Sequence, residues 1–188
     1  MGTLIVRAIV LLALPLVVFL GVGYLMQRLS DPSKLGKQVK KDYTGLGLRC
    51  TGYNLEQAKT YWSELKKAGA LDAEQRMLEM DLVFPFIYGA AFAGALLCAW
   101  AALGRTFHPV LILTPLFVEV VADWIENLIQ LKQIKLFAAN AASVQEGWIQ
   151  IASLATILKY WLFIVSYILV IGMVGWMLYK TWPRSSAR

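Results

Sequence analysis

Long uninterrupted blocks of apolar residues constrain this chain more than any other feature of its sequence. Four blocks cover approximately residues 4–26, 82–103, 110–131 and 157–178. Each has about the 20 residues that an α-helix needs to cross a hydrocarbon layer about 30 Å thick. The blocks lack the alternating pattern of transmembrane β-strands. The sequence therefore predicts an all-α, multi-pass membrane protein, a bundle of four transmembrane helices.

Composition supports this class. The chain is 59% hydrophobic and only 16% charged, which is too apolar for an ordinary soluble domain. We treat residues 1–188 as a single membrane domain and read the first block as an uncleaved helix, with a cleaved signal peptide as the alternative. In a bacterium such a protein would lie in the inner (plasma) membrane. The orientation of the chain in the membrane stays open.

The loop of residues 27–80 carries a helix of its own. Asn54, followed three residues later by Gln57, resembles a capping box, and Gly69 suits the helix end, so we expect a helix over about residues 55–68. Its apolar positions fall on one face: Leu55, Ala58, Trp62 and Leu65. We expect a short amphipathic helix that lies on lipid headgroups or covers the mouth of the bundle, with Tyr61 and Trp62 at the interface. A helix that docks a partner is the alternative.

A second cap is expected at Asp72, with Gln75 three residues later, opening a helix that continues into the second span. That span begins with Asp81, and Pro85 cannot donate a hydrogen bond to the Asp81 carbonyl. A kink would leave this carbonyl free beside a carboxylate. Tyr88 should project from the same face as Asp81, two turns deeper.

The third block contains polar residues at helical spacing. Glu119, Asp123, Glu126, Asn127 and Gln130 follow one another at i, i+4, i+7, i+8 and i+11. An ionisable residue costs about 2.5–3.5 kcal/mol to insert at the centre of a membrane helix. The stripe must therefore face the inside of the bundle or a wet cavity. Lys159 and Tyr160 of the last block enter from the same side of the membrane as Asp81.

We interpret these residues as the lining of an acidic cavity within the bundle, open toward the loops. Asp123, Glu126 and Asp81 are the candidate catalytic residues. The candidate ligand-binding residues are Tyr88, Glu119, Asn127, Lys159, Tyr160 and Trp124, and Trp161 adds to the walls. The alternative is a packing network in which Lys159 neutralises Asp123 or Glu126.

Other classes of function lack support in the sequence. The net charge is +6, and the basic residues lie mainly in the first loop and near the ends of the spans. This distribution favours contact with anionic lipid headgroups over binding of nucleic acid. His108 is the only histidine, and Cys50 and Cys98 form no metal or redox motif. We therefore assign no metal site, and a cofactor stays unknown. Membrane lipids are the expected partners, and a homo-oligomer stays open.

The four-span plan, and the acidic residue, apolar run and proline from Asp81 to Pro85, resemble the EXPERA group, which includes sterol isomerases and the sigma-2 receptor. The resemblance implies an intramembrane pocket, lined by carboxylates, for sterol-like or amine-bearing ligands. The first hypothesis is thus a protein that binds or transforms a small lipid-like or amine-bearing molecule. The alternatives are a cation or proton pathway and a non-catalytic subunit of a membrane complex.

Overall fold

The computed structural model describes residues 2–29, 45–105 and 107–181, and its regular secondary structure is helical. The helices, in chain order, are α1 (Gly2–Leu29), the 3-10 turn η1 (Leu46–Leu48), α3 (Leu55–Lys67), α4 (Leu71–Met80), α5 (Phe84–Ala102), α6 (Pro109–Ala139), the 3-10 turn η2 (Ala141–Ser143) and α7 (Glu146–Thr181). Residues 30–44 of the expected loop lie outside the described residues. The prediction of an all-α protein is confirmed.

Among the described residues, three helical stretches are long and apolar enough to cross a membrane: Gly2–Met26, Leu71–Ala102 and Glu146–Thr181. They match the first, second and fourth predicted spans, and they suggest a multi-pass membrane protein. Helix α6 is as long as a span, at 31 residues, but carries Glu119, Asp123 and Glu126 within the third predicted span.

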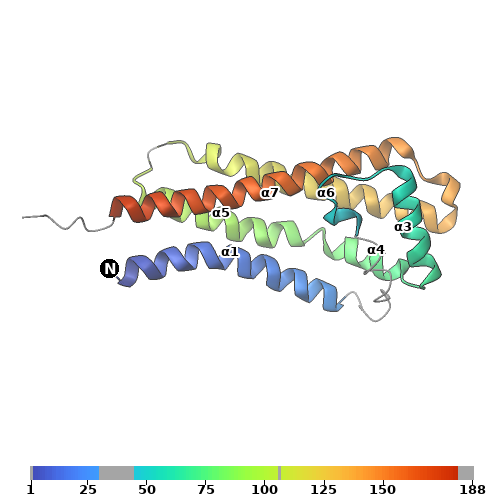
Figure 1. Cartoon of the computed structure of the whole chain (residues 1–188), viewed down its shortest axis with the longest axis horizontal. Coiled ribbons are helices and arrows are strands. Elements are labelled where there is room, and N and C mark those ends of the chain that lie inside the picture. The colour runs from blue at the N-terminus through green and yellow to red at the C-terminus, as the bar shows by residue number, and fades with distance from the viewer. Residues whose placement is uncertain (1, 30–44, 106, 182–188) are drawn as a thin grey trace, which may run out of the picture.

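The long helices α1, α5, α6 and α7 run side by side, and α3 and α4 lie at the end where α6 joins α7 (Figure 1). At about 1.5 Å per residue, the 36 residues of α7 extend about 54 Å. That is well beyond the ~30 Å hydrocarbon layer. Residues 132–139 continue α6 beyond the third predicted span, and the turn to α7 lies at residues 140–145.

Two hydrophobic cores divide the molecule. We call the first region the head: it consists of α3, α4 and the joined ends of α6 and α7. Its core contains Trp62, Leu65, Ile134, Phe137 and Ile149. We call the second region the bundle: it consists of α1, α5 and the remainder of α6 and α7, and its core includes Phe92, Leu96 and Val170.

The predicted helix of the first loop is confirmed as α3. Asn54 and Gln57 form the capping box, each side chain accepting a hydrogen bond of 2.9 Å from the other residue's backbone N–H. Tyr61 and Trp62 are buried in the head core, so their expected interfacial position is wrong. Through these residues, helix α3 packs on the joined ends of α6 and α7.

The expected cap at Asp72 is also wrong. Helix α4 begins at Leu71, its N-cap residue is Ala70, and no side chain caps it. The helix does not run unbroken into the second span either, because α4 ends at Met80 and α5 begins at Phe84, next to Pro85. Proline fits the first turn of a helix, where its missing N–H is not needed.

Candidate functional site: a buried acidic cluster

The polar stripe of α6 lies inside the bundle, as its spacing predicts. Its members are at most 4% exposed: Glu119, Asp123, Glu126, Asn127 and Gln130. They face α5, α7 and the chain segment that precedes α3. We call Glu119, Asp123, Glu126, Tyr88 and Lys159 the acidic cluster.

Tyr88 of α5 joins the two deeper carboxyl groups of the cluster. Its hydroxyl oxygen lies 2.6 Å from Glu119 Oε1 and 3.0 Å from Asp123 Oδ2. The phenol ring packs against Phe84 and Phe19, with ring centroids 4.8 and 5.6 Å away. Aromatic rings from α1 and α5 therefore surround this end of the cluster.

Lys159 of α7 pairs with the other end of the cluster. Its Nζ lies 2.8 Å from Asp123 Oδ1 and 2.7 Å from Glu126 Oε2, and Gln130 donates a hydrogen bond of 2.7 Å to Glu126 Oε1. The lysine side chain is 16% exposed, whereas that of Glu126 is fully buried. The predicted neutralisation of Asp123 or Glu126 thus involves both carboxylates at once.

The carboxyl groups outnumber the cation. Glu119, Asp123 and Glu126 are buried together, and Lys159 is the cation that contacts the cluster in the described part of the chain. Glu119 Oε2 is buried, and no described residue forms a hydrogen bond with it. Because an isolated buried charge is costly in an apolar medium, the cluster requires a proton or a further positive charge.

Asp81 lies at the break between α4 and α5. Its backbone carbonyl, which Pro85 cannot bond, accepts a hydrogen bond from a side chain of α6 instead. Asn127 donates hydrogen bonds to this oxygen, at 3.3 Å, and to Asp123 Oδ1, at 3.0 Å. Trp124 donates one of 3.0 Å to the carbonyl of Leu82. Asn127 and Trp124, both expected to bind a ligand, thus satisfy the backbone of the helix break.

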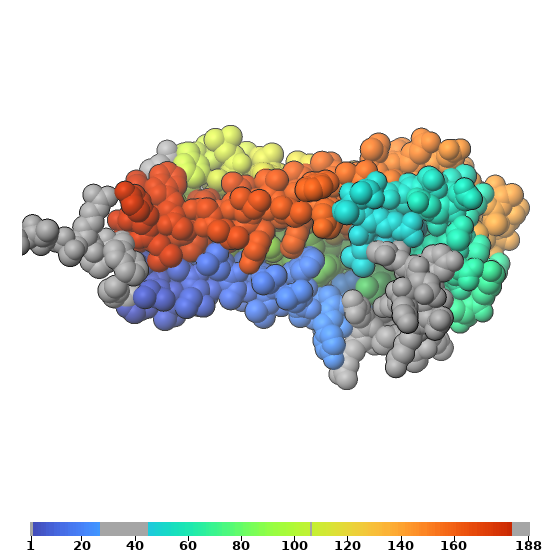
Figure 2. All heavy atoms as spheres, viewed as in Figure 1, coloured from blue at the N-terminus to red at the C-terminus, as the bar shows by residue number. Residues whose placement is uncertain are grey.

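The segment from Gly45 to Tyr53 covers the cluster from the head side, and sequence reasoning missed it. A methyl group on Gly47 would lie 3.1 Å from Glu126 Oε1 and 3.6 Å from Lys159 Nζ. Gly52 has a positive φ of 77° and leaves no room for a side chain against Ser153 and Ile157. We call Gly45–Tyr53 the cover segment; Figure 2 shows this part of the chain (cyan) lying against α7 (orange).

Tyr53 ties the cover segment to the stripe. Its backbone N–H donates a hydrogen bond of 2.8 Å to Ser153 Oγ, and its hydroxyl accepts one of 3.1 Å from Gln130. Burial raises the pKa of the Tyr53 hydroxyl, and the neighbouring Glu126 raises it further. This tyrosine therefore stays a neutral hydrogen-bonding group. The glycines at positions 47 and 52 were the signal of a close backbone approach.

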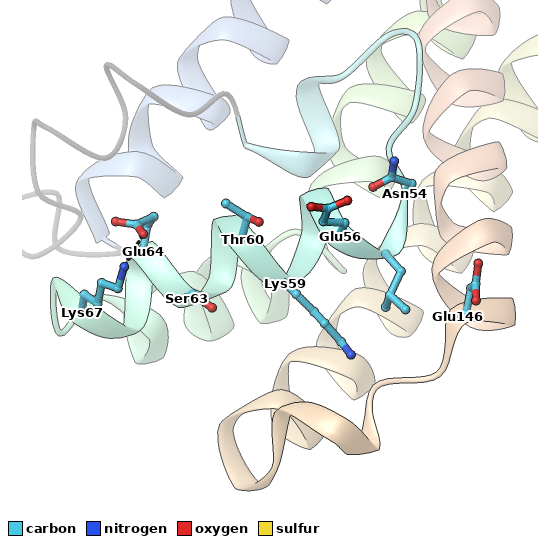
Figure 3. Close-up of a pocket in the computed structure, with 9 residues that line it drawn as sticks. Asn54, Glu56, Lys59, Thr60, Ser63, Glu64, Lys67 and Glu146 are labelled. Carbon is cyan, nitrogen blue, oxygen red and sulfur yellow. Dashed lines mark hydrogen bonds and ion pairs between the residues drawn. The ribbon is translucent and has the colours of Figure 1, made fainter.

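Tyr160 and Trp161 do not belong to the cluster, contrary to the expectation for a cavity wall. They are 41% and 56% exposed on the outer face of α7, and their rings contact each other. The cluster itself is packed by side chains and the cover segment. A pocket of about 680 Å³ lies elsewhere, between α3 and the start of α7, where Lys59 and Glu146 line it (Figure 3).

The carboxyl oxygens of the acidic cluster suit protons and ammonium groups better than a metal ion. Within residues 2–29, 45–105 and 107–181, the structure has no group of three or more histidine, cysteine or carboxylate side chains arranged to hold a metal. Lys159 already places an ammonium group between two carboxylates.

Comparison of the chain with protein-family models, curated proteins and solved structures finds no match.

Proposed function

We propose that this is a four-span membrane protein whose acidic cluster binds a small amine-bearing or lipid-like molecule. The fourth span would be α6. Its inward face carries the carboxyl groups, whereas its outward face carries exposed apolar side chains: Val110, Leu111, Phe117, Ile125 and Leu128. Such a helix can cross a bilayer only within a bundle that covers its polar stripe.

The excess of buried carboxyl groups over cations carries the proposal. Among the described residues, Glu119 Oε2 has no hydrogen-bond partner inside the bundle. Tyr88, which contacts Glu119 Oε1, packs its ring against Phe19 and Phe84. Carboxylates beside aromatic rings match a molecule with a cationic head and an apolar body. The same chemistry is what the resemblance to the EXPERA group implies.

Entry of a ligand requires a movement, because the cluster is closed. The cover segment and Lys159 lie at the end of the cluster nearest the head. Displacing them would expose Asp123 and Glu126 together and free an ammonium-sized position. Binding would therefore move the cover segment.

A transmembrane cation or proton pathway fits the structure less well. Beyond Glu119, the buried side chains of the described bundle are mainly apolar: Leu116 and Ile112 on α6, Phe92 and Leu96 on α5, and Val170 on α7. This apolar layer separates the cluster from the other end of the helices. The non-catalytic subunit remains the second candidate, because a closed network also stabilises packing.

Native mass spectrometry of the detergent-purified protein tests the proposal. Wild type is compared with Asp123→Asn and Glu126→Gln for a co-purifying small molecule or lipid. Glu79→Gln is the matched control, because Glu79 pairs with Lys135 on the exposed surface. An adduct present in wild type and the control, and lost in both cluster variants, supports binding. Folded wild-type protein without a specific adduct, after incubation with lipid extract, overturns it in favour of the subunit.

A further inference from the structure

The Tyr88 hydroxyl has two carboxyl neighbours but only one proton. Its oxygen lies within hydrogen-bonding distance of Glu119 Oε1, at 2.6 Å, and of Asp123 Oδ2, at 3.0 Å. A phenol donates one hydrogen bond, and an ionised carboxylate can only accept. If both carboxyl groups were ionised, one of these contacts would bring two oxygens together with no proton between them. One of the two carboxyl groups must therefore carry a proton.

The surroundings of the two groups identify which one does. Asp123 Oδ1 accepts hydrogen bonds from Lys159 Nζ and Asn127 Nδ2, at 2.8 and 3.0 Å, which stabilises the ionised form. Within the part of the chain that the structure describes, Glu119 has no such donors: its Oε2 is buried without a partner. An unpaired charge would be costly there, whereas the carbonyl oxygen of a neutral acid tolerates this position better.

We propose that Glu119 is a neutral carboxylic acid that stores a proton inside the bundle and is linked to Asp123 through Tyr88. The Oε1–H of Glu119 donates to the Tyr88 oxygen, and the Tyr88 O–H donates to Asp123 Oδ2. Asp123 in turn is paired with Lys159.

This chain of hydrogen bonds is also a path for one proton. In a transfer, the Oε1–H bond of Glu119 breaks as that proton bonds to the Tyr88 oxygen, and the original Tyr88 proton moves to Asp123 Oδ2. The result is an ionised Glu119 and a neutral Asp123, with Tyr88 unchanged. The acid of the cluster is thus Glu119, whereas the sequence favoured Asp123, Glu126 and Asp81 as the catalytic residues.

The charged groups around this path come from three elements. Helix α6 contributes Glu126, α7 contributes Lys159, and the break between α4 and α5 contributes Asp81. Helix α1 contributes the apolar ring of Phe19. Lys159, the cation among these described groups, contacts Asp123 and Glu126, so it stabilises ionisation there and leaves the proton on Glu119. This assignment concerns the protein without a ligand and does not depend on the proposed function.

Infrared difference spectroscopy at neutral pH tests the assignment. A protonated carboxyl group has a carbonyl-stretch band well above the bands of carboxylates, and this band shifts in heavy water. We expect the band in wild type, its loss in Glu119→Gln, and a shift to higher wavenumber in Tyr88→Phe, where the acid loses its acceptor. Glu126→Gln is the matched control, because Glu126 is equally buried on the same helix but is paired with Lys159, and it should keep the band.

Isotope labelling covers the case in which Glu119→Gln does not fold. Carboxyl-13C glutamate in the wild type should shift the band, and carboxyl-13C aspartate should leave it in place. No protonated-carboxyl band in wild type, or a band that follows aspartate or survives in Glu119→Gln, overturns the proposal. These outcomes are separate from the ligand test: the band can be present without any adduct, and an adduct can be found without the band.

Discussion

In the head, α3 turns Trp62 inward and Lys66 outward, whereas in the bundle α6 turns Asp123 inward and Phe117 outward. The head therefore sorts its residues as a protein in water does, with apolar side chains inside. The bundle carries apolar side chains on both faces of its helices and encloses polar ones. This inversion fits the proposal that α6 is a span, because the hydrocarbon of a bilayer accepts a side chain such as Phe117 but not a carboxylate.

The difference teaches which interactions stabilise each region. Apolar burial supplies most of the driving force in water. Between helices in lipid this driving force is absent, and close packing and polar contacts take its place. We therefore expect the head to respond mainly to loss of apolar volume, and the bundle mainly to changes of charge.

The largest expected effect is that of Lys159→Met. Removing the lysine leaves Asp123 and Glu126 unpaired within the bundle, which should lower the free energy of unfolding by about 3–5 kcal/mol. Equilibrium unfolding in mixed micelles measures this. Adding Asp123→Asn and Glu126→Gln to the same chain should restore most of the stability, because no uncompensated charge then remains.

Lys135→Met is the matched control for this variant. Lys135 pairs with Glu79 at 3.3 Å, and both side chains are about half exposed. Such a pair contributes about 0–1 kcal/mol. Equal effects of the two lysine variants would contradict the contrast between head and bundle.

The buried stripe could be predicted from the sequence because its pattern depends only on residues close together in the chain. A helix in lipid cannot expose Glu119, Asp123 and Glu126, so their spacing alone fixed the inward face of α6. The capping box at Asn54 is equally local, since both of its partners lie within one turn. These two predictions are confirmed by the structure.

The cover segment and the outward position of Tyr160 could not be predicted in the same way. Both depend on which element packs over Lys159, a contact between positions 47 and 159 that no periodicity encodes. In a helix that is apolar all round, such as α7, an aromatic residue next to a lysine has no pattern that marks its side. Trp62 was misplaced for the same reason: its tertiary partner, Phe137, is remote in sequence.

The second prediction compares the same substitution in the two cores. Leu65 of the head and Leu96 of the bundle are both fully buried. Leu65→Ala should cost about 2–5 kcal/mol, since the loss of transfer free energy from water adds to the cavity. Leu96→Ala should cost less, because its unfolded reference in a micelle or bilayer is also apolar. Unfolding curves of the two variants measure this, and a larger loss for Leu96→Ala would show that the bundle is also stabilised by apolar burial.

The third prediction concerns the contact of the cover segment with the cluster. Gly47→Ala places a methyl group 3.1 Å from Glu126 Oε1, and overpacking of this kind costs about 1–3 kcal/mol. Gly45→Ala in the same segment meets only the Tyr61 hydroxyl, at 3.7 Å, and should be close to neutral. Hydrogen exchange of residues 45–53 should accelerate in Gly47→Ala alone. If both variants exchange alike, the cover segment does not contact the ion pair.

The smallest effect is expected for Asn54→Ala, at the start of α3. The substitution removes one hydrogen bond of the capping box, from the Gln57 N–H, and leaves the Gln57 side chain to cap alone. The loss should be about 1 kcal/mol, and it should appear as faster hydrogen exchange in the first turn of α3. Gln57→Ala, which keeps the Asn54 cap, should cost less. Because the head and the bundle have separate cores, exchange in α5 should be unchanged in both variants; faster exchange there would mean that the two regions unfold as one unit.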